Sequence, residues 1–537
     1  GERAPLVGGP PLRGHRGGCV ALLVVGGLER VALVAISTNL GLYLSTTLGW
    51  GGGQGAFTSL LFLAASHLLS PVGGWLGDVY LGCHGTLVLS FSLSLLVASL
   101  LPVITTLDGR LSLCGQPPAP TTPNCSWNPG GTCSGHPPKL YCGPTIYSTL
   151  LVLALGFSSI RANLGPFGAD QVRNWAEDAP RRFFNWFYWS INVGAAFSLL
   201  LVAFVQQNIS LLVGYLIPIA CLALALLIFL LATPKFITKP PRGSQVSAII
   251  KLALKSWGCA RLGGTRISTR RWEVEDPLPN SRAQPGAPSL KEDLANFKVL
   301  AQILPTMLIF IPHWMVYSQV QSTYYLQGLH LSIPSTFQSS TSTSQGYTFP
   351  GAWLLLPHVL ILLALVPLKD QVIDPFLARH QLLPSLLQQM ALGMFFSLMS
   401  ILTAGRTQLG LGFSIGEMFG GFSTLYPHPT GILEQERWWH LHHNQTVPQL
   451  VGQDLPVAAT LPIWWQLPQY LLLGTSEIFT SIPALEFSYT EAPEAMKGAI
   501  MGLFFFITGL GSLLGLGLWT LLDLPTHGWT SCPRDDG

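Results

Sequence analysis

Two consecutive apolar stretches each carry a polar side chain in an unusual place. Residues 156–172 (GFSSIRANLGPFGADQV) contain Arg161, and residues 181–198 (RRFFNWFYWSINVGAAFS) contain Asn192. An arginine near the bilayer centre costs about 2.5–3.5 kcal/mol on insertion scales, so it normally faces a partner or a water-filled cavity. The pair predicts a polar site within a membrane. The alternatives are a structural ion pair for Arg161 and a helix-to-helix hydrogen bond for Asn192, a common use of asparagine in membranes.

The composition is that of a polytopic membrane protein. Of the 537 residues, 49% are hydrophobic and only 10% are charged, and the mean hydropathy is +0.44. Soluble domains contain about 25% charged residues. Residues 1–18 are polar and rich in glycine and proline, carry Arg13 and Arg16, and lack the pattern of a cleavable signal. We expect them to form a cytosolic N-terminal tail.

Eleven stretches are apolar and long enough to cross a bilayer, which takes about 20 residues. They cover residues 19–46, 56–77, 84–106, 145–165, 184–206, 210–232, 299–319, 352–368, 385–405, 461–485 and 496–522. A basic segment, residues 235–297, separates six of them from five. This predicts an all-α protein with an N-terminal six-helix bundle (19–234), a cytosolic linker (235–297) and a C-terminal bundle (298–523). A twelfth span would complete two equal halves, and none is visible.

The distribution of basic residues predicts the orientation. Lysine and arginine concentrate in the linker and in the loops that share its side, which places that side in the cytosol. Residues 107–144, 406–460 and 524–537 are then lumenal. The sequons at Asn124 and Asn444 fall in these loops and are expected to be glycosylated, whereas the sequon at Asn208 is too close to the membrane.

The two lumenal loops have further distinguishing features. Four of the nine cysteines lie within residues 107–144, at Cys114, Cys125, Cys133 and Cys142. An oxidising compartment predicts one or two disulfides there, with unpaired thiols as the alternative and no pairing readable from the sequence. Residues 406–431 are glycine-rich, without helical periodicity, and are interpreted as an insertion in the long loop.

Several longer motifs resemble known transporter families. GGWLGDVYLGCHG, residues 73–85, resembles the loop signature of the major facilitator superfamily, in which Gly74, Asp78 and Gly82 would hold two helices close. RRFFNWFYWSIN, PHWMVYSQVQSTYYLQGLHL and WWQLPQYLLLGTSEIF resemble the peptide/histidine branch of the proton-coupled oligopeptide transporters. The resemblance covers residues 19–405 and 432–537. It implies the major facilitator fold of two pseudo-symmetric helical bundles, and a transporter rather than an enzyme.

The resemblance also implies which residues would bind a zwitterionic peptide. Arg30 and Arg161 would hold the carboxylate, for which the arginine fork is well shaped. Glu477 would face the ammonium group, and Asn192 would bond the peptide backbone. The seventh span would add an aromatic wall and an amide, provided by Trp314, Tyr317 and Gln319. A buried protonated acid is the alternative for Glu477, and an ordinary packing stripe is the alternative for the seventh span.

Proton coupling would depend on the first span. Glu29 adjoins Arg30 and is the candidate proton carrier, because pairing favours its ionised form and burial opposes it. The family's motif there, E-x-x-E-R, has lost its first acid, which is Gly26 in this chain. His358 stands where the branch commonly has asparagine; it could titrate near pH 6.5, and we assign it no role.

The tail and linker bear on location. Residues 2–7, ERAPLV, resemble an acidic dileucine sorting signal, which favours endosome and lysosome membranes. The resemblance therefore predicts proton-driven export of histidine, di- and tripeptides, and small muramyl peptides linked to innate immunity, from the lumen to the cytosol. No motif for a metal, nucleotide, nucleic acid or organic cofactor is present. The alternatives are an uncoupled facilitator, or a non-transporting scaffold that binds cytosolic adaptor proteins through residues 235–297 and the N-terminal tail.

Overall fold

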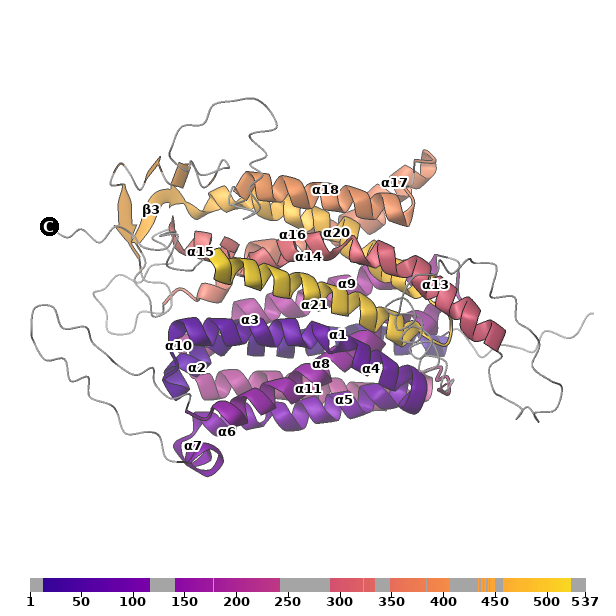
Figure 1. The fold of residues 1–537 in the computed structure, drawn as a ribbon, viewed down its shortest axis with the longest axis horizontal. Coiled ribbons are helices and arrows are strands. Elements are labelled where there is room, and N and C mark those ends of the chain that lie inside the picture. Colours follow the sequence, from indigo (N-terminus) through magenta and orange to yellow (C-terminus); the bar gives the residue numbers. More distant parts are fainter. Residues whose placement is uncertain are drawn as a thin grey trace, which may run out of the picture.

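The fold places two helical bundles side by side with their helices nearly parallel to one long axis (Figure 1). The computed structural model describes residues 13–115, 141–176, 178–241, 290–321, 323–333, 348–382, 384–404, 433, 436–437, 439–440, 443, 445–449 and 457–522. Asn124, Asn444, residues 406–431, most of the predicted linker and the segment 524–537 lie outside this part of the chain. What the sequence indicates for those residues stays a prediction.

The N-terminal bundle, indigo to magenta in Figure 1, is built from the spans before the linker. Its helices are α1 (Arg13–Thr38), α2 (Leu40–Leu48), α3 (Gly52–Leu68), α4 (Ser70–Leu76), α5 (Gly82–Ala98), α6 (Leu100–Thr105), α8 (Gly143–Val172), α9 (Ala179–Phe197), α10 (Ala203–Asn208) and α11 (Leu211–Ala232). A short helix, α7 (Leu107–Cys114), lies outside the bundle at one end. Its eight residues were predicted as loop, because a helix of two turns leaves little periodic signal.

The C-terminal bundle, red to yellow in Figure 1, packs against the first. Its helices are α13 (Leu290–Leu308), α14 (Ile311–Tyr317), α15 (Thr323–Leu329), α16 (Leu356–Leu368), α17 (Asp374–Arg379), α18 (Leu386–Ala404), α20 (Leu467–Thr490) and α21 (Lys497–Leu522). Between the bundles, α21 packs on α3 and α4, while α9 packs on α16. The cores of both bundles are buried apolar side chains, as expected of helices that turn one face to their neighbours.

Every predicted span falls on a helix or on a run of short helices. Within the described residues, eight helices are long and apolar enough to cross a membrane. A ninth results if Lys298–Leu308 and Ile311–Leu329, which are bent by 42° relative to each other, make one span. One of the eight, Gly53–Thr105, has 53 residues and contains the second and third predicted spans. A straight helix of that length would be far longer than a bilayer. The chain turns at Gly82, where φ is +69°, a value that favours glycine.

The tenth predicted span begins later than expected. Residues 461–485 were assigned to it, whereas α20 begins at Leu467 and residues Val457–Pro462 form β3. β3 is the middle strand of a small sheet, parallel to β1 (Leu331–Ser332) and antiparallel to β2 (Thr446–Pro448). The sheet lies outside the bundles, so the all-helical description of the membrane region stands. Two helices also start inside predicted polar segments, α1 in the tail and α13 in the linker.

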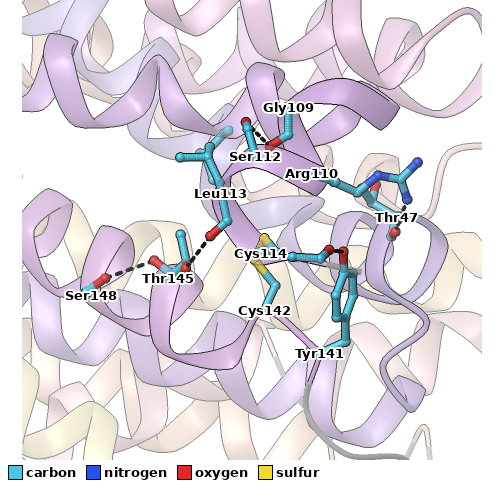
Figure 2. Close-up of a disulfide and its surroundings, with 12 residues drawn as sticks. Thr47, Gly109, Arg110, Ser112, Leu113, Cys114, Tyr141, Cys142, Thr145 and Ser148 are labelled. Carbon is cyan, nitrogen blue, oxygen red and sulfur yellow. Dashed lines mark hydrogen bonds between the residues drawn. A yellow bond between two sulfur atoms is a disulfide. The ribbon is translucent and has the colours of Figure 1, made fainter. Parts of the chain in front are cut away.

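The molecule has two distinguishable ends. We call the end that holds residues 233–241 and 491–496 the linker end, and the opposite one, with α7 and the sheet, the disulfide end (Figure 1). A disulfide joins Cys114 to Cys142, at the end of α7 and just before α8 (Figure 2). The prediction of a disulfide in residues 107–144 is therefore confirmed, and Cys125 and Cys133 lie outside the described residues. By the positive-inside prediction, the linker end would face the cytosol.

Candidate functional site

A cavity of about 210 Å³ lies between the two bundles. Its wall combines side chains from both bundles, and the polar members include Glu29, Arg30, His67, Arg161, Asn192, Tyr317, His358 and Glu477. The lining also reaches Ser37 at the end of α1 and Leu516 in α21, both in the disulfide-end half. Among the described residues of its wall, two arginines and two glutamates are charged, and there is no lysine or aspartate. The cavity can therefore offer opposite charges to one ligand.

Glu477 is buried in the middle of α20, with 3% of its surface exposed. The Tyr188 hydroxyl donates a hydrogen bond to its Oε1 across the boundary between the bundles. His358 Nε2 lies 2.8 Å from Oε2, although the pair is not aligned as a good hydrogen bond. Within the described residues no lysine or arginine forms an ion pair with this carboxylate. Its lone pairs can therefore accept another donor, such as an ammonium group.

Arg161 is 9% exposed and lies in the long helix α8. None of its three guanidinium nitrogens has a hydrogen-bond partner among the described residues, and its Cζ lies 5.7 Å from the centre of the Phe505 ring. A structural ion pair, the alternative for this residue, is not found in the described part of the chain. Buried polar groups normally have partners, so an unpartnered guanidinium that lines a cavity suits an anionic ligand.

The first span brings Glu29 and Arg30 to the same cavity. Glu29 is buried, and its Oε1 and the Arg30 Nε lack partners among the described residues. At Gly26, one turn earlier, an added Cβ would lie 2.8 Å from Cε2 of Phe187. An acid at that position would require the Phe187 ring to move. The cavity therefore receives one carboxylate from α1, in line with the departure from the family's motif.

Asn192 also lines the cavity, from α9. Its amide nitrogen donates to the Tyr188 carbonyl of its own helix over 2.8 Å. This hydrogen bond stays within α9, so it is not the helix-to-helix hydrogen bond that was the alternative for Asn192. Tyr188 and Asn192 are four residues apart, so they share a helix face, and both reach the cavity.

The aromatic wall of the seventh span is present, but Gln319 is not part of it. Trp314 and Tyr317 line the cavity with their rings edge to face, 5.5 Å apart. Gln319 lies outside the lining; its Nε2 donates to the Met315 carbonyl over 3.2 Å, and it sits against Gly515 of α21. The α-helix ends at Tyr317 and continues as a 3₁₀ turn over Ser318–Gln321. This tighter turn changes the angle between successive side chains.

Two contacts in the cavity were not predicted from the sequence. Tyr188 bonds Glu477 from the opposite bundle, and His358, to which no role was given, lies beside the same carboxylate. The four-residue spacing between Tyr188 and Asn192 was a signal for the first. The second had no sequence signal, because residues 358 and 477 meet only through the packing of α16 on α20.

The loop motif joins the bundles at the linker end. Asp78 accepts hydrogen bonds from the backbone N–H of Gly498 over 3.2 Å and of Ala499 over 2.7 Å, at the start of α21. A carboxylate suits this place because the first N–H groups of a helix lack partners within it. Gly74 faces Gly498, where an added Cβ would overlap the Gly498 carbonyl oxygen. Gly82 makes the turn into α5.

A charged network, which we call the linker-end seam, lies next to the loop motif. Asp170 contacts Lys239 over 2.8 Å and Lys497 over 3.2 Å, and Glu494 contacts Lys497 over 3.0 Å, Lys239 over 3.4 Å and Arg173. Burial alone would raise the pKa of Glu494, but its hydrogen bond to Lys497 and the charges of Lys497, Lys239 and Arg173 lower it to about 2. Further along this end, Asp374 contacts Arg181 over 2.8 Å. These contacts connect segments of both bundles at the linker end.

Comparison with known proteins agrees with this architecture. A sequence profile described as the POT family matches residues 128–423 and 438–531. Solute carrier family 15 member 3 of Mus musculus is 51% identical over 100% of this chain and 89% of its own, and the protein of the same name in Rattus norvegicus is 50% identical over the same shares. The solved structure of the POT family transporter PepTSo has a TM-score of 0.60 at 18% identity, covering 95% of this chain and 90% of that one.

Proposed function

This chain belongs to the POT family of transporters, and from that premise we propose that it is a proton-coupled symporter, which moves free histidine and di- or tripeptides from the endolysosomal lumen to the cytosol. The predicted family, the helical major facilitator fold and the assignment as a transporter rather than an enzyme are confirmed. The substrates, the direction and the coupling ion are the proposed part. Small muramyl peptides, and with them a role in innate immunity, remain an extension of the same proposal.

The observation that supports the substrate class is the unpartnered guanidinium of Arg161 facing the same cavity as Glu477. An α-amino acid or a short peptide carries one carboxylate and one ammonium group. Two opposite charges on opposite bundles, in a site shielded from bulk water, can each form a charge-assisted hydrogen bond to such a substrate. Trp314 and Tyr317 provide flat apolar surface for a side chain or a peptide plane.

Glu29 supports the proposed coupling to protons. It is buried beside Arg30 on α1, without a hydrogen-bond partner for Oε1 among the described residues. Protonation of Glu29 would free the charge of Arg30 for the substrate carboxylate, which makes proton and substrate binding cooperative. Gly26 provides no second acid, so we expect coupling to depend on Glu29 more than it would with the full family motif.

The proposed location depends on the tail and the linker. Residues 2–7 resemble an acidic dileucine signal, and an acidic lumen would supply the driving protons. Cytosolic adaptor proteins would meet the tail and residues 235–297. The glycosylation proposed at Asn124 and Asn444 fits a lumenal disulfide end, where the Cys114–Cys142 bond lies.

The test is uptake by the full chain at the cell surface, with Leu6 and Val7 replaced by alanine to disable sorting. Labelled histidine and a labelled dipeptide would be offered at about pH 5.5 and about pH 7.5, a range over which proton-linked groups change charge. We expect uptake several-fold faster at the acidic pH, and loss of that difference in Glu29→Gln. Equal uptake at both values would identify an uncoupled facilitator. Absence of uptake by folded surface protein would favour the scaffold.

A further inference from the structure

The Glu477 carboxylate lies beside a hydroxyl and an imidazole, and no lysine or arginine of the described residues forms an ion pair with it. Tyr188 of α9 donates to one oxygen, and the imidazole of His358, on α16, lies 2.8 Å from the other. Glu477 and His358 each expose 3% of their surface. A carboxylate taken out of water without a paired cation is costly, and sharing a proton with an adjacent imidazole removes that cost.

We propose that His358 and Glu477 together hold one exchangeable proton, which the ammonium group of a substrate displaces. This inference rests on the proposed function, because it needs a substrate amine to reach Glu477. In the empty site the proton resides on one of two neighbouring atoms, Glu477 Oε2 or His358 Nε2, which lie 2.8 Å apart. When the ammonium arrives, its N–H donates to the carboxylate, and the proton leaves through the cavity to solvent water. A second cation at the carboxylate would leave the buried site with an excess positive charge.

No described group around the pair supplies a positive charge in contact with Glu477 that would take the place of this proton. From α9, Tyr188 contributes a hydroxyl, and from α14 the Tyr317 ring lies 5.8 Å from the His358 ring. From α1, Arg30 is close enough to act on Glu477 electrostatically but forms no ion pair with it in the described structure. The sequence of α18 has no titratable residue, and the single charged residue of α21, Lys497, lies at the linker end.

The consequence is a proton count that depends on the substrate. A dipeptide with a free amino group should release one proton more on binding than the same dipeptide with its amino group blocked, because the blocked form leaves the pair's proton in place. His358 acts here as a positioning residue, which accepts or donates the shared proton while Glu477 meets the substrate. His358→Asn keeps a hydrogen-bond donor for the carboxylate but removes the second proton-binding atom, so the pair should retain its proton only at lower pH.

The experiment is isothermal titration of the purified full chain in lipid nanodiscs, in two buffers that differ in protonation enthalpy. Alanyl-alanine and N-acetyl-alanyl-alanine would be compared at about pH 5.5, in the range where imidazole groups bind protons. We expect a difference of one proton released per bound molecule for the wild type and a clearly smaller difference for His358→Asn. His313→Asn is the matched control: His313 is buried in the same bundle and does not line the cavity.

The outcomes separate this inference from the proposed function. Failure of the wild type to bind or transport alanyl-alanine would contradict the function itself. Binding with equal proton release for the two dipeptides would overturn the exchangeable proton. If the blocked dipeptide does not bind, the pH dependence of alanyl-alanine affinity decides: the pH at which affinity changes should shift by about one unit in His358→Asn and stay unchanged in His313→Asn. Coincident curves for His358→Asn and wild type would reject the proposal.

Discussion

Single side chains in the cavity carry the charges that the proposed zwitterionic substrate needs, and Glu477 is the acid assigned to its ammonium group. Glu477→Gln keeps the size and removes the charge, so the ammonium loses a charge-assisted hydrogen bond of about 1.5–3 kcal/mol. We expect the kcat/KM of dipeptide transport to fall by about tenfold to a hundredfold. Uptake by Glu477→Gln at the wild-type rate would remove this acid from the site. Glu486→Gln is the control, because Glu486 is on the same helix but not in the lining.

Arg161 should be the counterpart for the carboxylate. In Arg161→Ala the substrate carboxylate loses a bidentate hydrogen-bond donor. The affinity for histidine should therefore fall about tenfold or more. It should then equal the affinity for histamine, which lacks the carboxylate. Competition of unlabelled histidine and histamine against a labelled dipeptide would measure this. A variant that still prefers histidine over histamine as strongly as the wild type would contradict the assignment. Arg161→Lys should recover part of the preference, because it restores charge without the planar fork.

Whether these side chains could be found from the sequence depended on how unusual each residue type is within an apolar stretch. Arg161, Glu477 and Glu29 stand out because a charge in an apolar stretch is expensive, and all three line the cavity. Tyr188 was overlooked, although it lies four residues before Asn192 and so shares a helix face with it. Gln319 lies outside the lining, although Trp314 of the same stripe is in it, because the stripe assumes an α-helical angle that the 3₁₀ turn after Tyr317 does not keep. The contact between His358 and Glu477 requires the tertiary fold.

At the scale of elements, the crossing of α4 and α21 depends on the absence of side chains. Gly74→Ala would place a methyl group against the Gly498 carbonyl, and the helices would have to separate. Overpacking of this kind costs about 1–3 kcal/mol, so thermal unfolding in detergent should occur at a lower temperature. Gly53→Ala is the matched control on α3, where an added Cβ meets nothing within 4 Å. Equal melting temperatures for the two variants would argue against a close crossing in solution.

The elements themselves were predictable where they are long. A run of about 20 apolar residues has few alternatives to a spanning helix, and each predicted span corresponds to helix. α7 and the small sheet were missed, since β1 has two residues and its partner β3 is more than 120 positions away in the chain. The start of α20 was placed too early because the end of β3 and the 3₁₀ turn Ile463–Gln466 are rich in apolar residues and precede the helix without a break.

At the scale of the whole molecule, the linker-end seam should hold the two bundles together at the linker end over the physiological pH range. The pKa of Glu494 is held at about 2, below its value in an unfolded chain, so its stabilising contribution is fully present above about pH 4.3 and is lost only as the pH falls toward 2. Glu494→Gln should therefore make the linker-end seam more accessible to a labelling reagent, by the same factor at about pH 5 and about pH 8.

This can be measured as the rate at which a thiol in Ala495→Cys reacts with an impermeant maleimide from the linker end, with and without Glu494→Gln. The ratio of the two rates removes any pH dependence that the cavity itself imposes. A ratio that approaches one at about pH 5 would mean that Glu494 is already protonated there, contrary to its shifted pKa. Arg182→Gln is a suitable control, because Arg182 pairs with Asp178 at the surface and not with the seam.

The bond between Cys114 and Cys142 has a consequence for the lifetime of the protein. It closes the segment from Cys114 to Cys142 into a covalent ring. This segment connects the third and fourth predicted spans, on the side proposed to face the lumen. A peptidase that cuts once anywhere between these two cysteines would open the ring without separating the fragments. The membrane bundle would remain one covalent molecule, visible as a single band until a reducing agent is added. If the disulfide end faces a compartment that contains hydrolases, as proposed, a single cut within this ring would leave the transporter assembled.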